Sequence, residues 1–313
     1  MAEFDFIRDF VRPFGVPPAP VGPGDDCAVV PSSRTPLCVT TDAVVEGVHF
    51  TLRHFSWEDV GHKALAVNLS DLAAMGAVPS WFVCALALPR GARSAQVRAL
   101  ARGMAPLARE AGIRLVGGNF TQAKELSVTL TAAGRVGARG ALLRSGGRPG
   151  DQLYVSGTLG DARLGLACLG MRRAPRAQLR QRRPRPRLGL GLLSAHYASA
   201  GIDISDGLVG DLGHLCNASR VGARVSLAAL PVSSELRKEA GRHAWRWAVA
   251  GGEDYELLLA VPRKAVRAFE RASRRAGHSV ANVGELTRRR AVVFVDARGR
   301  PTAVPHGFEH FTP

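Results

Sequence analysis

The sequence predicts an α/β or α+β fold with two domains, and three observations support this. The chain has 313 residues, whereas a single domain usually has roughly 100–200, so we expect two hydrophobic cores. Short apolar or β-branched runs alternate with helical patterns, as in proteins whose sheets are covered by helices. Hydrophobic residues make up 46% and charged residues 22% of the chain, which excludes the disordered and collagen-like classes.

In the first half of the chain, apolar spacing and turn residues predict the elements in order. Apolar residues recur at helical spacing from Val60 to Met75, and Gly76 and Pro79 follow, which is the usual end of a helix. The strand that begins at Arg114 should end at Gly117-Gly118. Strands are expected at 37–41, 81–88, 114–116 and 126–136, and helices at 57–75 and 94–111.

The glycine- and arginine-rich stretch 137–150 interrupts this periodicity and is the expected linker. We place the domain boundary near residue 146, which gives domains of 1–146 and 147–313. In the second half, strands are expected at 152–156, at 255–261, at 291–295 and on entering 202–207, with helices after Asp161 and from Leu208.

Neither a membrane nor an oxidising compartment is indicated. The longest apolar stretch, 81–88, is far shorter than the roughly 20 residues of a membrane span. The first residues are acidic where a signal peptide would be basic and then apolar. The five cysteines are scattered without a C-x-x-C pair, so we interpret them as buried or incidental thiols. We expect a cytoplasmic protein.

The charge balance raises the possibility of an anionic partner without identifying one. There are 42 basic and 26 acidic residues, and 38 of the basic residues are arginine, which indicates a bias throughout the chain. Eight arginines gather between Met171 and Leu188, but prolines at 175, 184 and 186 make this run a loop or a short helix, and no aromatic residues are interleaved for base stacking. We therefore expect a solvated basic loop, and no nucleic acid as the primary partner.

Acidic residues recur at positions where the sequence predicts that an apolar run ends in a turn. The segments are Gly24-Asp25-Asp26, Thr40-Thr41-Asp42, Asp203-Ile-Ser205-Asp206-Gly207 and Gly251-Gly252-Glu253-Asp254, joined by Asp71 in a helical segment. Each one alone is more typical of a turn or a helix N-cap. Together they favour a shared site, and converging carboxylates require cations such as magnesium or calcium. Such a site, with hydroxyls from Thr40, Thr41 and Ser205, suits a nucleoside triphosphate, although no phosphate loop or protein-kinase motif is present.

Seven motifs in order resemble the thiamine-monophosphate kinase family. They are GDDCAVV (24–30), TTDAVVEGVHF (40–50), KALAVNLSDLAAMGAVP (63–79), LVGGN (115–119), SGTLGDA (156–162), IDISDGL (202–208) and GGEDYELL (251–258), followed by HGFEHF (306–311). This resemblance implies a fold like that of aminoimidazole ribonucleotide synthetase. An N-terminal α/β domain would bind ATP and magnesium and pair its sheet with that of a second copy in a homodimer, and a C-terminal α+β domain would complete the site.

The resemblance also implies the reaction and the residues that serve it. ATP would phosphorylate thiamine monophosphate by direct in-line transfer, assisted by several Mg²⁺ ions, and no general base is required. Asp42, Asp71 and Asp206 would assist transfer through magnesium. The implied metal ligands are Asp26, Thr40, Thr41, Asp42, Asp71, Asn119, Asp203 and Asp206; the ATP contacts are Gly118, Asn119, Arg144 and Ser205; and the thiamine-side residues are His49, Glu253 and Phe308.

Two positions depart from the family pattern, and two other functions stay open. Asn119 stands where relatives often have aspartate, which removes one formal charge but keeps a carbonyl oxygen. Phe308 stands where relatives often have tyrosine and keeps the ring. A related ATP-dependent ligase or selenophosphate-type synthetase is a second reading of the same motifs. A nucleic-acid-binding protein is the third, motivated by the arginine run.

Overall fold

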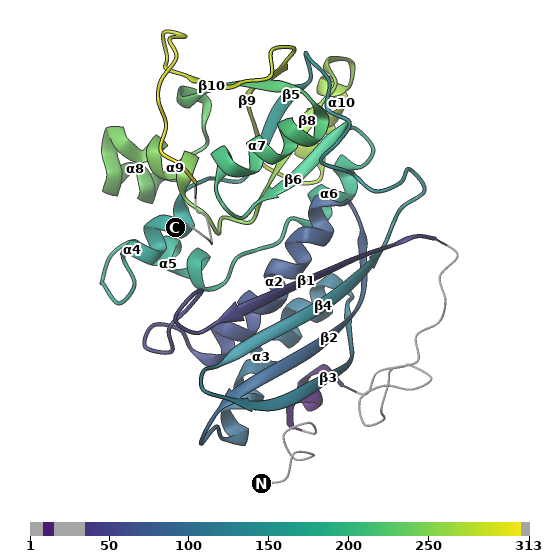
Figure 1. Ribbon diagram of the computed structural model, residues 1–313, viewed down its shortest axis with the longest axis vertical. Helices are drawn as coiled ribbons and strands as arrows, with labels where there is room; N and C mark the ends of the chain where they lie inside the picture. Colours follow the sequence, from purple (N-terminus) through teal and green to yellow (C-terminus); the bar gives the residue numbers. More distant parts are fainter. Residues whose placement is uncertain (1–8, 16–34, 308–313) are drawn as a thin grey trace. The chain divides into compact units, whose positions relative to one another are not determined.

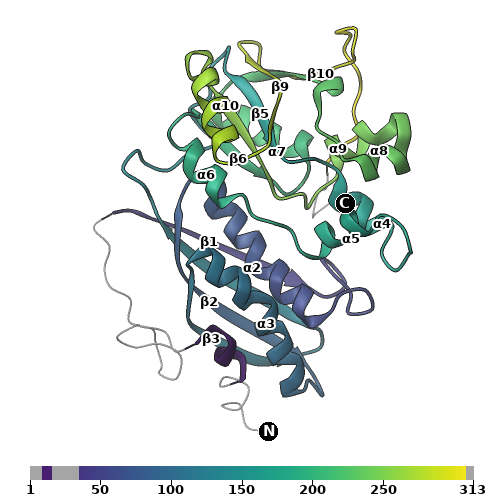
Figure 2. The same cartoon turned by 180° about the vertical axis from the view of Figure 1, so that it is seen from behind.

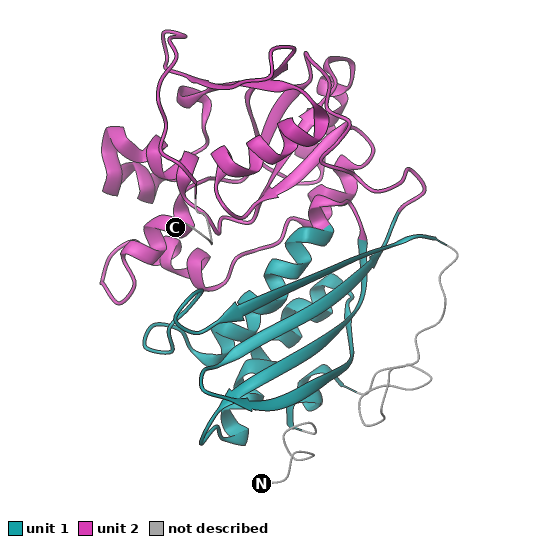
Figure 3. Cartoon of the chain, viewed as in Figure 1, with its two compact units in different colours: residues 1–72, 78–136 teal, residues 73–77, 137–313 magenta. Residues whose placement is uncertain are grey.

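A computed structural model describes residues 9–15 and 35–307 of the chain, which forms two compact units (Figure 3). Unit 1 comprises Met1–Leu72 and Val78–Val136, and unit 2 comprises Ala73–Ala77 and Gly137–Pro313, within the described ranges. Each unit has its own sheet and its own core, as the chain length predicts. None of the helices in the described ranges is long and apolar enough to span a membrane.

Unit 1 is a four-stranded sheet with helices on one face. The sheet has the order β1-β4-β2-β3, with β2 and β3 parallel and the other neighbours antiparallel. Figure 2 views the face covered by α2 and α3, and Figure 1 views the opposite face. The elements are η1 (Arg12–Phe14), β1 (Leu37–Val45), α2 (Trp57–Ala74), β2 (Val78–Pro89), α3 (Ser94–Ala111), β3 (Arg114–Ala123) and β4 (Ser127–Arg135).

Two glycines let α2 and α3 pack backbone against backbone. A Cβ atom on Gly61 of α2 would lie 2.0 Å from the carbonyl oxygen of Leu100, and one on Gly103 of α3 would lie 1.9 Å from that of Glu58. No side chain fits at either position, so glycine is required there. Because α2 is buried on nearly every side, its apolar residues are spread around the helix rather than confined to one stripe.

The second face of the unit 1 sheet carries exposed apolar residues. Period-two alternation directs Phe82 and Leu86 of β2 toward the helices, where both are buried. On the opposite face, Val39 of β1 is 61% exposed and Leu37 is 41% exposed. Such a face is unusual for a sheet surrounded by water and bears on the oligomeric state proposed below.

Unit 2 is a six-stranded sheet with helices on both faces, visible from its two sides in Figures 1 and 2. The sheet order is β10-β7-β9-β5-β8-β6, in which only the β10–β7 neighbours are parallel among the described strands. The strands are β5 (Gln152–Ser156), β6 (Ala200–Ile204), β7 (Gly222–Ser226), β8 (Glu256–Val261), β9 (Val280–Thr287) and β10 (Val292–Val295). The helices are α4 (Asp161–Ala167), α5 (Pro175–Arg182), α6 (Leu188–Ser194), α7 (Leu208–Ser219), α8 (Ser234–Ala240), α9 (Ala244–Ala250) and α10 (Val266–Arg275), with short 3-10 turns η2 (Leu227–Ala229), η3 (Gly241–His243) and η4 (Arg263–Ala265).

Two cores hold this sheet between its helix layers. Leu153, Ile202 and Leu258 pack with α7 on one face, and Leu257 and Phe269 pack with α6 and α10 on the other. All six residues of β8 are buried, because both of its faces are covered. The predicted combination of α/β and α+β architectures is confirmed.

Two predicted strand ends are wrong. The strand from Arg114 continues through Gly117-Gly118 to Ala123, so Asn119 lies inside β3 rather than after it. The reason is a close approach of β3 to β2, since a Cβ on Gly118 would lie 2.1 Å from the carbonyl oxygen of Cys84. Likewise Asp42 lies within β1, which continues to Val45.

Candidate active site

In unit 1, β1 and α2 bring a hydroxyl and a carboxylate into contact. Alternation places Thr40 and Asp42 on the same face of β1 as Val44, which is 2% exposed and faces α2. The Thr40 hydroxyl donates to Oδ2 of Asp71 on α2. The predicted ligand segments around Thr40 and Asp71, which are distant in sequence, therefore meet on the face of the sheet that α2 covers.

Thr41 and Asn119 lie on the other face of that sheet and at its opposite edges. The Thr41 hydroxyl donates to the Leu130 carbonyl oxygen at 3.0 Å and accepts from the Thr131 hydroxyl at 3.1 Å. Asn119 pairs with Ala85 of β2, so its exposed side chain faces the same way as that of Thr41. Since β1 and β3 are separated by β4 and β2, three strand spacings of about 4.8 Å place these residues at least about 14 Å apart. One chain does not bring them together.

His49 lies in the turn after β1 and is held by polar contacts with Val45 and Lys63. Its Nδ1 accepts from the Val45 amide at 3.1 Å, and its own amide donates to the Val45 carbonyl oxygen at 2.9 Å. Nζ of Lys63, a residue only 1% exposed, donates to the His49 carbonyl oxygen at 3.3 Å. The imidazole ring is therefore oriented by the end of the strand.

In unit 2, three carboxylates gather at the end of β6. Asp203 lies in β6 and is 5% exposed, Asp206 follows it, and Asp211 lies in the first turn of α7. Oδ2 of Asp211 accepts from the Ser205 amide at 3.1 Å and from the Asp206 amide at 3.2 Å. Burial, together with the charges of Asp203 and Asp206, raises the pKa of Asp211 to about 7.

The sequence prediction missed Asp211, although its position in the first helical turn after Gly207 is a recognisable signal. In residues 9–15 and 35–307, no three His, Cys, Asp or Glu side chains stand close enough to hold a metal ion together. The chemistry of the cluster nevertheless fits a hard cation, because neighbouring buried carboxylates repel one another and offer only oxygen ligands.

The segment 251–255 lies beside the end of β6. The Glu253 amide donates to the Ser205 carbonyl oxygen at 2.6 Å, and the Tyr255 amide donates to that of Ile204 at 2.9 Å. The C-terminal segment reaches the same place, since a Cβ on Gly307 would lie 2.9 Å from the Asp206 carbonyl oxygen. Two predicted motifs, and the described start of the closing motif, thus meet in unit 2. Phe308 and Asp26 lie outside the described residues.

Arg144 is anchored at the other end of β6. Its carbonyl oxygen accepts from the Ser219 hydroxyl at 2.7 Å, and that of Leu143 accepts from the Gly201 amide at 3.0 Å. Because β6 rises about 3.3 Å per residue, the backbone of Arg144 is more than about 10 Å from Ser205. Its side chain is exposed. The backbone alone therefore does not bring these two predicted ATP contacts together.

The interpretation of the arginine run as a solvated loop is wrong for two of its members. Residues Pro175–Arg182 form α5, and Arg180 donates to Asp161 at 2.8 Å. Arg187 donates from Nε to Oε2 of Glu256 at 2.6 Å and from a second nitrogen to Oε1. Both carboxylates are buried, at 2% and 1% exposure, so these arginines neutralise charges that water cannot reach.

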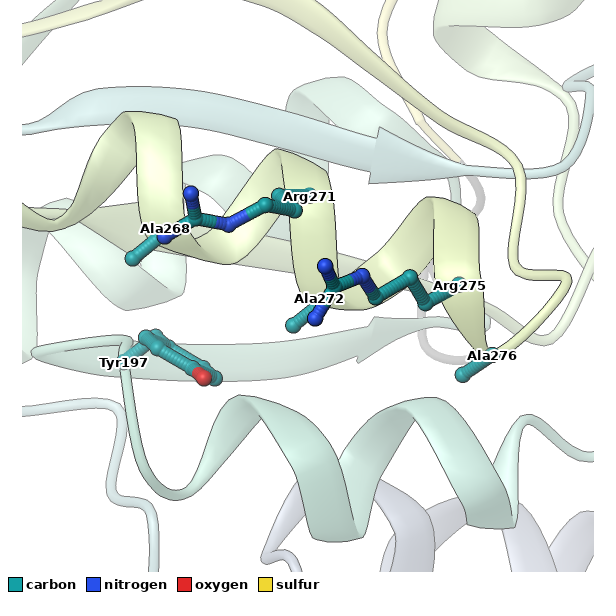
Figure 4. A pocket seen from close by; sticks show the side chains of 6 residues that line it. All are labelled: Tyr197, Ala268, Arg271, Ala272, Arg275 and Ala276. Atoms are coloured by element: carbon teal, nitrogen blue, oxygen red, sulfur yellow. The ribbon is translucent and has the colours of Figure 1, made fainter.

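A cavity of about 490 Å³ lies between α10 and Tyr197, away from the predicted site residues. Figure 4 shows that Arg271 and Arg275 extend along its rim, one turn apart. None of the predicted ligands lines it, so the cavity has no part in the site described above.

Comparison with known proteins identifies the family. The model of the AIR synthase related protein N-terminal domain matches residues 24–136, and that of the C-terminal domain matches residues 148–296. The thiamine-monophosphate kinase of Escherichia coli strain K12 is 40% identical over 302 residues, covering 93% of this chain and 92% of that protein.

Two solved structures agree with this assignment. The thiamine-monophosphate kinase of Stenotrophomonas maltophilia K279a is 37% identical, with a TM-score of 0.86 over 96% of this chain and 98% of that chain. AaThiL complexed with AMPPCP and TMP is 33% identical, with a TM-score of 0.80 over 92% and 91%. The chain therefore belongs to the AIR synthase related proteins and, among them, to the thiamine-monophosphate kinase family.

Proposed function

We propose that this protein uses ATP to phosphorylate thiamine monophosphate, forming thiamine diphosphate and ADP. The observation that carries the proposal is its similarity over 92% of its length to a protein crystallised with AMPPCP and TMP. AMPPCP is an ATP analogue whose bridging carbon prevents transfer, so that protein was complexed with an ATP analogue and TMP together. The meeting of the segments 202–207 and 251–255 in unit 2 supports the same assignment.

Magnesium is the proposed cofactor, bound by Asp26, Thr40, Thr41, Asp42, Asp71, Asn119, Asp203 and Asp206. When bound, Mg²⁺ offsets the repulsion between two phosphorylated substrates and stabilises charge on the transferring group. Asp211 holds the Ser205 and Asp206 amides, which fixes the loop that carries the Asp206 carboxylate. The acceptor phosphate is ionised near neutral pH, so transfer requires no side chain as a general base.

The remaining residues are assigned by the chemistry of the two substrates. Gly118, Asn119, Arg144 and Ser205 are proposed ATP contacts, with Arg144 neutralising phosphate charge. His49, Glu253 and Phe308 are proposed to hold thiamine monophosphate. A carboxylate and an aromatic ring suit a cationic thiazolium ring. We propose residues 1–146 as the ATP- and magnesium-binding domain and 147–313 as the domain that completes the site.

We propose a homodimer, and the geometry of the unit 1 sheet supports it. Thr41 and Asn119 share one face but lie at opposite edges, at least about 14 Å apart, so they cannot hold one ion within a chain. A two-fold axis parallel to the strands would set β1 of one copy opposite β3 of the other. It would also cover the exposed Leu37 and Val39. We therefore propose that the sheets pair face to face and that a second copy supplies Asn119.

We also propose a cytoplasmic location. The four described cysteines, Cys38, Cys84, Cys168 and Cys216, are free thiols, as is usual in a reducing compartment. ATP and magnesium are supplied there as well.

The test of the function is product formation by the purified full-length chain. With ATP, Mg²⁺ and thiamine monophosphate, chromatography should show thiamine diphosphate and ADP in equal amounts. ATP-dependent turnover of another acceptor, with none of thiamine monophosphate, would instead favour the related ligase or selenophosphate-type synthetase. No turnover under any metal or salt condition would refute the kinase assignment.

A further inference from the structure

The backbone around Glu253 is strained. Glu253 has φ +68° and Tyr255 has φ +50°, and neither is glycine. Left-handed backbone costs free energy for residues with a side chain and persists only where the surroundings enforce it. Here the Tyr255 amide donates to the end of β6 and the Glu253 amide to Ser205, the next residue. The carboxylate of Asp254 accepts from the Gly160 and Ala162 amides at 2.6 and 3.0 Å. Residues 253–255 are therefore each fixed by a separate contact.

Gln181, at the end of α5, contacts the Glu253 side chain directly. Its Nε2 donates to Oε2 of Glu253 at 2.5 Å, and Gln181 is 1% exposed. An ionised carboxylate only accepts hydrogen bonds, so the amide nitrogen must face Glu253 and the amide oxygen must face away. Within the described residues that oxygen, Oε1, is buried and has no hydrogen-bond partner. The amide thus pairs with one oxygen of the Glu253 carboxylate, Oε2, and leaves its own acceptor unpaired, which has a cost in stability.

The segment that follows α5 also contacts β8, the strand after the turn. Arg187 binds both oxygens of Glu256, the first residue of β8, and Glu256 also accepts from the Ser156 hydroxyl at 2.5 Å. Gly157 leaves the room for this carboxylate, because a Cβ there would lie 2.1 Å from Oε1. Residues 181–187 therefore hold the strained turn at both of its acidic ends.

We propose that Gln181 is a positioning residue that orients the Glu253 carboxylate toward the cationic half of the substrate, with the Arg187–Glu256 ion pair fixing the turn from its other end. This inference rests on the proposed function, in which Glu253 binds the thiamine side. The geometry explains why Gln181, which is buried, and Arg187, which is partly exposed, both turn their side chains inward from a basic segment. It also predicts an effect on one substrate and not on the other.

The central variant is Gln181→Leu, with Gln178→Leu as its matched control. Gln178 is also a buried glutamine of α5, but its amide donates to the Met171 and Arg173 carbonyl oxygens instead. Loss of one hydrogen bond to a charged group should raise KM and Kd for thiamine monophosphate about tenfold. KM for ATP should change less than about twofold, and Gln178→Leu should alter neither constant.

A double-mutant cycle separates positioning from general loosening. If Gln181 acts through Glu253, then Gln181→Leu should have no further effect on thiamine monophosphate binding once Glu253→Gln is present. Arg187→Lys keeps the charge but breaks the two-point grip, and it should show the same selectivity for thiamine monophosphate over ATP. This variant carries the test if Gln181→Leu does not fold.

The outcomes distinguish this inference from the proposed function. Wild-type protein that neither binds nor phosphorylates thiamine monophosphate would refute the proposed function. If the wild type is active, three results would each overturn the inference alone: equal effects of the Gln181 and Gln178 variants, equal effects on both substrates, or additive effects in the cycle.

Discussion

Replacing Arg187 with methionine should lower stability by an amount that the buried ion pair determines. The Glu256 side chain is 2% exposed and that of Arg187 is 30% exposed, so the variant leaves a carboxylate that water cannot reach. Removing one partner of a buried pair costs about 3–5 kcal/mol. Because Ser156 still donates to Glu256 and Arg187 is partly exposed, we expect a loss near the lower limit, about 3 kcal/mol. For a unit of this size that corresponds to a fall in Tm of about 6–12 °C.

The assay is thermal and urea unfolding of the full chain, with Arg185→Met as the control. Arg185 lies two residues away on the same segment and is exposed, so its replacement should change the free energy of unfolding by less than about 0.5 kcal/mol. The double variant Arg187→Met with Glu256→Gln should recover part of the loss, because no buried charge remains. Equal small effects of Arg187→Met and Arg185→Met on the free energy of unfolding would refute this reasoning and would favour the interpretation of the segment as a solvated loop.

Three further predictions concern the metal ligands, the pH dependence and the helix packing. Asp71→Asn removes the charge of a proposed magnesium ligand, so it should reduce kcat by at least about 100-fold. Because asparagine keeps an acceptor for the Thr40 hydroxyl, Tm should change by less than about 2 °C; a large fall in Tm would indicate a structural role. In metal-free protein, Asp211 has a folded-state pKa near 7, above its unfolded value, so its contribution to stability should increase as pH falls from about 7 to about 4. The Ser205 and Asp206 amides both donate to Oδ2 of Asp211, which leaves Oδ1 to take the proton. Asparagine does not titrate, so Asp211→Asn should flatten that part of the pH–stability curve; an unchanged slope would contradict this. Gly61→Ala should destabilise by at least about 1–3 kcal/mol because its Cβ would meet the Leu100 carbonyl, whereas Gly213→Ala, with nothing within 4 Å, should be neutral or stabilising in urea unfolding.

Local patterns predicted most of the fold because each depends on neighbours in sequence. The helix expected at 94–111 is observed as Ser94–Ala111, ended by Gly112 in the left-handed conformation. The strand expected at 152–156 is observed with the same bounds. In contrast, the pair Gly117-Gly118 predicts the end of a strand. Gly118 instead lies within β3, because the backbone of β2 approaches it closely.

The parts of the site that sequence did not predict depend on long-range partners. Nothing local distinguishes Arg187 from Arg185, and only the fold brings Glu256 within reach of one of them. The alternation of β1 places Thr40 and Thr41 on opposite faces, but the opposite-edge positions of Thr41 and Asn119 follow from the strand order. The roles of Arg144 and Glu253 stay predictions that rest on the family.

The most direct test of the proposed mechanism is the dependence of thiamine diphosphate formation on free magnesium, measured for wild-type protein and for Asp42→Asn. We expect no product in excess EDTA, a rise steeper than first order as Mg²⁺ is restored because several ions bind, and at least about a 100-fold lower maximal rate for the variant. Undiminished formation of thiamine diphosphate in EDTA, or a variant as fast as the wild type, would contradict the proposal that these carboxylates bring the two phosphorylated substrates together through magnesium.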